Sequence, residues 1–172
     1  MKVSLDDEEA LVKLAKKTTI DLEQKEEGLR IYLDAQDVSL KIRSQEVTNN
    51  TFYIARAPRV REILVNWQRE IGSKKSIVAE GRDVGTVVFP KATKKFYLDA
   101  SVTERWQRRL RELQLQKKEV DPQKLLIEIK ERDQKDLTRA VGPLKKADDA
   151  IFIDSTNLTI QQVTEKILEH IN

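Results

Sequence analysis

Hydrophobic residues recur at helical spacing over several stretches of this chain, and short apolar runs lie between those stretches. Helical periodicity predicts helices over residues 4–16, 46–57, 58–72, 102–117, 121–139 and 160–171. Alternating runs at 18–22 and 28–33 flank a polar turn and predict an antiparallel hairpin, with a third short strand within 34–39. Apolar runs at 77–79, 95–100 and 150–154 have the length of buried strands.

Composition narrows the class of protein. Of 172 residues, 39% are hydrophobic and 35% are charged, and the formal net charge is +3. This length suits one domain, and the small positive excess suits an anionic small ligand as readily as nucleic acid. Cysteine is absent and His170 is the single histidine, which argues against disulfides, thiolate metal sites and histidine-based catalysis. Neither a membrane span nor a signal peptide is expected, and the predicted location is cytoplasmic.

Polar residues suited to ligand binding follow the apolar run at 77–79. Gly81 and Gly85 enclose the neighbouring pair Arg82 and Asp83. Glycines at this spacing allow a tight turn and a close backbone approach, and ligands of open parallel sheets bind at the carboxyl ends of strands. An arginine–aspartate pair considered alone is more often part of a solvated loop.

A second charged segment lies in the helix predicted over 121–139. The stripe that carries leucine and isoleucine in its first half is continued, at the same angular position, by Arg132, Asp136 and Arg139. Spacings of four and three residues allow Asp136 to pair with either arginine within the helix. The alternative is that this face borders a polar cleft.

These segments belong to motifs that resemble bacterial cytidylate kinase. The motifs are Glu80-Gly81-Arg82-Asp83-x-Gly85-Thr86-Val87-Val88-Phe89-Pro90, Phe96-x-Leu98-Asp99-Ala100-Ser101, Glu104-Arg105-x-x-Arg108-Arg109 and Glu131-Arg132-Asp133-x-x-Asp136-x-x-Arg139-Ala140-x-x-Pro143-Leu144. The resemblance implies an α/β fold, with a P-loop nucleoside-monophosphate-kinase-like parallel sheet, flanking helices and a small antiparallel β insert. It assigns 18–57 to the nucleoside-monophosphate-binding insert, 76–100 to core strands, 105–140 to the lid region and 150–172 to a C-terminal strand and helix.

The same resemblance implies phosphorylation of CMP and dCMP to CDP and dCDP, with ATP as donor and Mg²⁺ as cofactor. Arg82, Arg132 and Arg139 match the family's phosphate contacts, and the last two match arginines that approach the transferred phosphoryl group. Arg108 matches a position on the ATP side. No residue is assigned to a metal, no membrane or nucleic-acid partner is implied, and a complete chain is expected to be a monomer.

Base and sugar recognition are also implied by the resemblance. Asp83 and Arg61 take the positions that read cytosine, since a carboxylate accepts from the exocyclic amine and an arginine donates to the acceptors. Asp136, with Arg132, takes the position that reads the ribose hydroxyls. Phe52 stands where the family usually has a serine near the base, which weakens the expected contact with cytosine and leaves stacking on the base as the alternative.

One family motif does not occur in these 172 residues. No glycine precedes Lys-Ser or Lys-Thr, so the P-loop pattern G-x-x-x-x-G-K-[ST] is absent. We therefore expect a truncated cytidylate kinase domain that lacks the first strand, the P-loop and the first helix, and that is inactive as it stands. The alternatives are a catalytically dead nucleotide-binding or regulatory module, and a basic RNA-binding protein. The low aromatic content, 5%, disfavours RNA binding.

Overall fold

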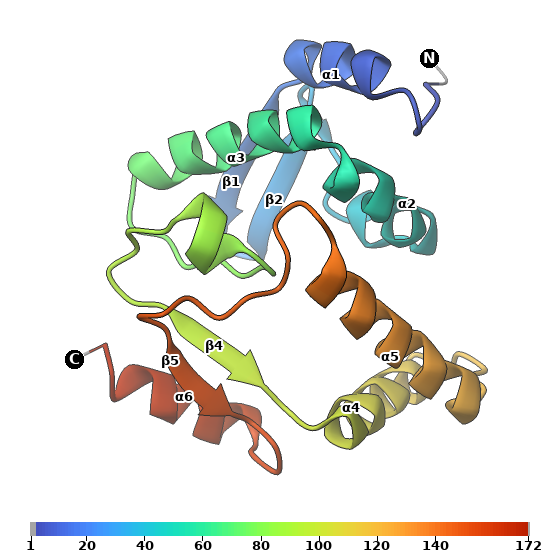
Figure 1. Cartoon of the computed structure of the whole chain (residues 1–172), viewed down its shortest axis with the longest axis vertical. Coiled ribbons are helices and arrows are strands. Elements are labelled where there is room, and N and C mark those ends of the chain that lie inside the picture. The colour runs from blue at the N-terminus through green and yellow to red at the C-terminus, as the bar shows by residue number, and fades with distance from the viewer. Residues whose placement is uncertain (1–2, 172) are drawn as a thin grey trace. The chain divides into compact units, whose positions relative to one another are not determined.

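A computed structural model describes residues 3–171, except for the side chains of Gln45, Asn49 and Phe52. The chain forms two compact units, Met1–Ile77 and Val78–Asn172 (Figure 1).

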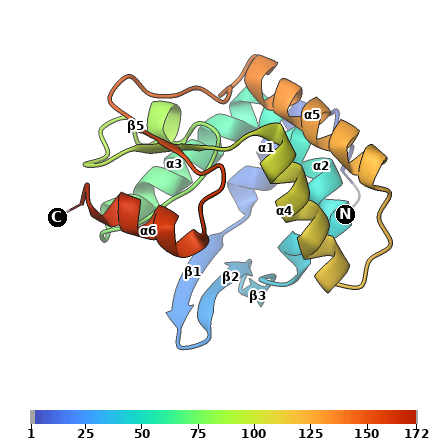
Figure 2. The ribbon, with the colours of Figure 1, turned by 90° about the horizontal axis from the view of Figure 1, so that it is seen from below.

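The first unit contains the predicted hairpin and the third short strand. β1 (Ile20–Lys25) pairs antiparallel with β2 (Gly28–Leu33), and β3 (Gln36–Asp37) pairs with the end of β2 (Figure 2). Gly28 closes the turn with φ +118°, a backbone conformation that side-chain-bearing residues rarely adopt. The alternating pattern therefore predicted both the pairing and the position of the turn.

Helices of the first unit begin where the sequence offers caps. The side chain of Asp7 accepts a hydrogen bond from the Ala10 amide and starts α1 (Glu8–Lys17). A short 3₁₀ turn, η1 (Lys41–Arg43), precedes α2 (Gln45–Arg56). α3 (Pro58–Ser73) has proline in its first turn, where the missing amide costs nothing.

α1 and α3 pack against each other (Figure 1). The core between them comprises Leu11, Val12, Ala57 and Val60, with Val3, Leu5, Ile54, Ile63 and Leu64 packed around these four. The periodicity predicted the burial of Leu11 and Val60, but Leu14, on the expected apolar face of α1, is 45% exposed.

The second unit is built on two parallel strands. β4 (Phe96–Asp99) pairs with β5 (Ile151–Asp154), and Asp99 lies opposite Asp154 at the carboxyl end. Past this end, Ser155 donates its amide to the Asp99 carbonyl at 2.7 Å and its hydroxyl to the same oxygen at 2.9 Å. The two strands therefore end in register, and their acidic ends are held together.

Three helices complete the second unit. α4 (Val102–Leu115) and α5 (Pro122–Thr138) begin at Ser101 and Asp121, whose side chains accept hydrogen bonds from first-turn amides. α6 (Ile160–Leu168) begins with a capping box, in which the side chains of Thr159 and Gln162 each accept a hydrogen bond from the other's backbone amide. No helix within residues 3–171 combines the length and hydrophobicity that crossing a membrane requires.

The strand predicted over residues 77–79 is wrong. Residues 76–81 have no regular secondary structure, and Val78 is fully exposed, at 104% of its reference area. A strand requires a hydrogen-bonded neighbour, and within residues 3–171 the parallel sheet consists of β4 and β5 alone. An apolar run gives a segment side chains that suit a buried strand, but it does not determine whether another strand pairs with it.

Candidate functional site

Asp83 lies at the start of a single π-helical turn, η2 (Val84–Val88). Its backbone carbonyl accepts hydrogen bonds from the amides of residues 86–88 at 2.8–3.3 Å, and the Phe89 amide donates to the Val84 carbonyl at 2.7 Å. Asp83 is 6% exposed, and burying a carboxylate requires cations or hydrogen-bond donors around it. Single π-turns recur at functional sites, so this turn and its buried acid form the centre of the candidate site.

Gly81 allows the backbone to enter this turn. A Cβ at Gly81 would lie 2.7 Å from Cγ2 of Val84, which is closer than carbon atoms pack. A Cβ at Gly85 would lie 3.5 Å from the Lys95 stem, an ordinary contact. Only the first of the two glycines is therefore required by close approach.

Gly81→Ala is expected to lower the free energy of unfolding by about 1–3 kcal/mol, because the added methyl overpacks Val84. Thermal unfolding measures the effect. Gly85→Ala is the matched control, since it adds the same methyl four residues away without a clash. Equal melting temperatures for the two variants would contradict the expectation.

Two ion pairs join the Arg82–Asp83 segment to the end of α5. Arg82 Nε lies 2.6 Å from Asp136 Oδ2, and Arg139 Nη2 lies 3.9 Å from Asp83 Oδ1. The Arg139 side chain is 15% exposed and that of Arg82 is 43% exposed. Each arginine thus faces a carboxylate from the other segment, and the cluster combines two cations with two anions.

The chain after α5 is held by further hydrogen bonds. Arg139 Nε donates to the Gly142 carbonyl at 2.5 Å, and the Leu144 amide donates to the Asp136 carbonyl at 2.7 Å. Gly142 has φ +56°, which suits glycine where the chain reverses. This reversal keeps Arg139 beside Asp83.

The ion pairs within α5 that the sequence allowed are not the ones formed. Asp136 pairs with Arg82, 54 residues away, and not with its helix neighbours. Arg132 is exposed on α5 and, in the part of the chain that the structure describes, its side chain makes no hydrogen bond or ion pair. The charged half of the stripe therefore faces the Arg82–Asp83 segment and leaves Arg132 available to an anion.

Comparison with known proteins identifies the family. The model of the cytidylate kinase family matches residues 1–172. The chain belongs to the cytidylate kinase family. It is 46% identical to a cytidylate kinase of Aeromonas salmonicida over 168 residues, which cover 98% of this chain and 73% of the relative. A cytidylate kinase of Enterobacter is 48% identical, with 98% and 74% covered, and one of Geobacillus is 46% identical, with 99% and 76% covered.

Family membership implies the P-loop nucleoside-monophosphate-kinase fold, and the α/β architecture with its parallel and antiparallel sheets agrees with it. Four of the predicted site residues, Arg82, Asp83, Asp136 and Arg139, lie together in the second unit. Arg61 lies on α3 in the first unit. The side chain of Phe52 is outside the described residues.

Arg108, which sequence resemblance assigned to the ATP side, has several partners within this cytidylate kinase family chain. Its Nε donates to Glu104 at 2.8 Å, and its Nη atoms donate to the Ser155 hydroxyl at 3.2 Å and to the carbonyls of Ser155 and Leu158 at 2.6 and 3.2 Å. These bonds hold α4 against the chain that follows β5. The assignment to the ATP side stays a prediction.

Sequence reasoning missed two cations that organise the site. Arg105 donates to Asp99 and the Ala100 carbonyl and, at 2.6 Å, to Asp133 of α5, so it joins β4 to the helix that carries Asp136. Lys95 lies beside η2 and pairs with Asp149. Neither pairing leaves a local signal, because the partners are far apart in the sequence.

Carboxylates near the two ends of β5 have shifted pKa values. The pKa of Asp149 is lowered because the Lys95 ammonium group donates hydrogen bonds to it. The pKa of Asp154 is lowered because Thr156 donates hydrogen bonds to it. Both groups are therefore held in the ionised form.

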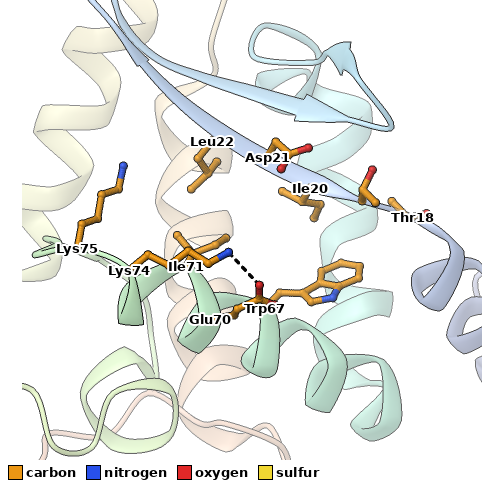
Figure 3. Close-up of a pocket in the computed structure, with 10 residues that line it drawn as sticks. Thr18, Ile20, Asp21, Leu22, Trp67, Glu70, Ile71, Lys74 and Lys75 are labelled. Carbon is orange, nitrogen blue, oxygen red and sulfur yellow. Dashed lines mark hydrogen bonds and ion pairs between the residues drawn. The ribbon is translucent and has the colours of Figure 1, made fainter.

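A hollow of about 440 Å³ lies in the first unit, between β1 and α3 (Figure 3). Ile20 and Leu22 of β1 and Trp67 and Ile71 of α3 form its apolar part, and Lys74, which is paired with Glu70 at 2.9 Å, also lines it. None of the predicted site residues lines it. We assign it no part in the site.

Within residues 3–171 no group of three or more His, Asp or Glu side chains could hold a metal ion. The P-loop pattern, whose amides, lysine and hydroxyl hold Mg²⁺–ATP in this fold class, does not occur in the 172 residues.

Proposed function

We propose that this chain carries the CMP-binding and lid residues of a cytidylate kinase. Such an enzyme transfers the γ-phosphoryl group of ATP to CMP or dCMP and releases ADP with CDP or dCDP. The observation that supports the proposal is the cluster of Arg82, Asp83, Asp136 and Arg139, which joins two segments 54 residues apart. Residues 1–172 by themselves are proposed to bind CMP without catalysing transfer.

The arginines suit the phosphate groups of the two substrates. A guanidinium fork matches phosphate oxygens and keeps its charge at every relevant pH. Arg132 is exposed and Arg82 is partly exposed, so both are accessible to a phosphate. In the absence of ligand the carboxylates of Asp136 and Asp83 balance Arg82 and Arg139, and a bound phosphate would compete with them.

Asp83 suits recognition of the base. It is buried at the start of η2, where a ligand group that does not form a hydrogen bond with the carboxylate would weaken binding. Cytosine presents an exocyclic amine that can donate a hydrogen bond to a carboxylate. Uracil presents a carbonyl at that position, which cannot donate one. We propose that Asp83 and Arg61 read the base, and that Asp136 with Arg132 binds the ribose hydroxyls.

Asp83→Asn is expected to narrow the preference for CMP over UMP by about 1–3 kcal/mol, because an amide can donate to the uracil carbonyl. Isothermal titration of CMP and UMP into the 172-residue chain measures the preference. Asp121→Asn is the matched control, since asparagine also caps a helix and Asp121 only starts α5. A ratio of the two dissociation constants that is unchanged in Asp83→Asn would exclude Asp83 from base recognition.

A further inference from the structure

Lys95 is a buried lysine whose ammonium group has three hydrogen-bond acceptors. Its side chain is 8% exposed. Its Nζ lies 2.7 and 2.9 Å from the two carboxylate oxygens of Asp149, and it also donates to the Pro90 carbonyl. Lysine is almost never this deeply buried unless it is paired, and Asp149 is the partner that balances its charge here.

The lysine contacts both parts of the segment that follows Asp83. Its stem lies against Gly85, with Cδ and Cγ at 3.5 and 3.8 Å from a Cβ built there, and its ammonium group binds Pro90 just beyond η2. The η2 amides in turn bind the carbonyl of Asp83. A single side chain thus restrains the turn that begins at Asp83.

Asp149 fixes the other end of this restraint. It lies two residues before β5, and the Ile151 amide donates to the Lys95 carbonyl at 2.9 Å. The backbone of Lys95 and the chain beside Asp149 are therefore joined at the start of the parallel sheet. The ion pair ties the η2 segment to this rigid element.

We propose that Lys95 and Asp149 form a positioning pair that fixes the backbone of residues 83–90 and thereby sets the preference for CMP over UMP. The role in base preference rests on the proposed function of Asp83. Neither residue touches the nucleotide in this proposal. Small displacements of a recognition group have large effects on binding and rate, so loosening the turn should affect selectivity as well as stability.

The experiment compares Lys95→Met, which keeps an unbranched stem without charge, with Asp149→Asn and Asp149→Glu. Glu112→Gln is the control, because it breaks the 2.7 Å ion pair between Arg109 and Glu112 on the surface of α4. Hydrogen exchange of the amides at 86–89 reports on the turn. Titration with CMP and UMP reports on base preference, and thermal unfolding reports on stability.

Lys95→Met and Asp149→Asn are expected to speed exchange at residues 86–89 about tenfold, and to reduce the CMP preference roughly five- to tenfold. Asp149→Glu should retain most of the slow exchange and most of the CMP preference, because it keeps the carboxylate. Glu112→Gln should change neither the exchange rate nor the CMP preference. Should Lys95→Met fail to fold, Asp149→Asn decides alone, because Asp149 is exposed.

Unchanged exchange at 86–89 in Asp149→Asn would overturn the restraint itself. Faster exchange or lower stability with an unchanged CMP preference would leave the pair a purely structural role and overturn the positioning role. A parent chain that binds CMP no better than UMP would refute the proposed function of Asp83, and the exchange measurement would still decide whether the restraint exists.

Discussion

Arg139→Ala is expected to reduce phosphoryl transfer by about a thousandfold in a chain completed by a family P-loop unit, because an arginine at the transferred group neutralises the charge of the transition state. The free energy of unfolding should also fall, by about 1–3 kcal/mol. The stability loss follows from the contacts of Arg139, which is 15% exposed, lies 3.9 Å from the Asp83 carboxylate and donates to Gly142. Single-turnover rates and thermal unfolding measure the two effects.

Arg132→Ala is the matched control for this prediction. Arg132 lies on α5, the helix that Arg139 directly follows, but its side chain is exposed and, within the described residues, makes no hydrogen bond or ion pair. Its removal should slow transfer with almost no change in melting temperature. Intact transfer in Arg139→Ala alongside a large loss of stability would show that Arg139 is structural, and the proposed lid face would be wrong.

Local patterns account for the parts of the fold that the sequence predicted. Helix faces and caps depend on residues three or four positions apart, and the β1–β2 hairpin depends on alternation around the turn at Gly28. The strand expected at 77–79 failed because pairing is not local. Its apolar residues are right for a strand, but no described strand pairs with them.

In the candidate site, too, the sequence predicted local features but not the contacts between distant residues. Family motifs identified Arg82, Asp83, Asp136 and Arg139 by type and spacing, but not which of them pair. Spacing within α5 allowed pairs inside the helix but did not require them, and the structure pairs Asp136 with Arg82, 54 residues away. The Lys95–Asp149 pair spans the same separation, and no periodicity reports on it.

The arginines of α4 show why positive charge in the sequence did not by itself indicate a function. Considered as sequence, residues 105–111 suited a solvated face or an RNA-binding surface. In the structure Arg105 binds Asp133, Arg108 binds Glu104, and Arg109 binds Glu112. Carboxylates already neutralise these cations, so less positive charge remains for a nucleic-acid backbone than the arginine count suggests.

Residues 1–172 by themselves are expected to release ADP from ATP and CMP at a rate at least about a hundredfold below that of a fusion carrying a family P-loop unit ahead of Met1. Removing one oriented donor typically costs a hundred- to a thousandfold in rate. The 172 residues contain no G-x-x-x-x-G-K-[ST] motif, so they offer no ring of loop amides, no loop lysine and no hydroxyl for Mg²⁺.

A coupled ADP-release assay on both proteins tests this expectation, with a third protein in which the lysine of the fused loop is replaced by alanine. Titration with CMP first establishes that each protein is folded and binds its acceptor. The fusion should turn over, and the lysine variant should fall toward the rate of the short chain, because the loop lysine neutralises charge on the phosphates. A short chain that turns over within about tenfold of the fusion would contradict the prediction, since the arginines of the lid would then suffice for transfer without the oriented donors of the loop.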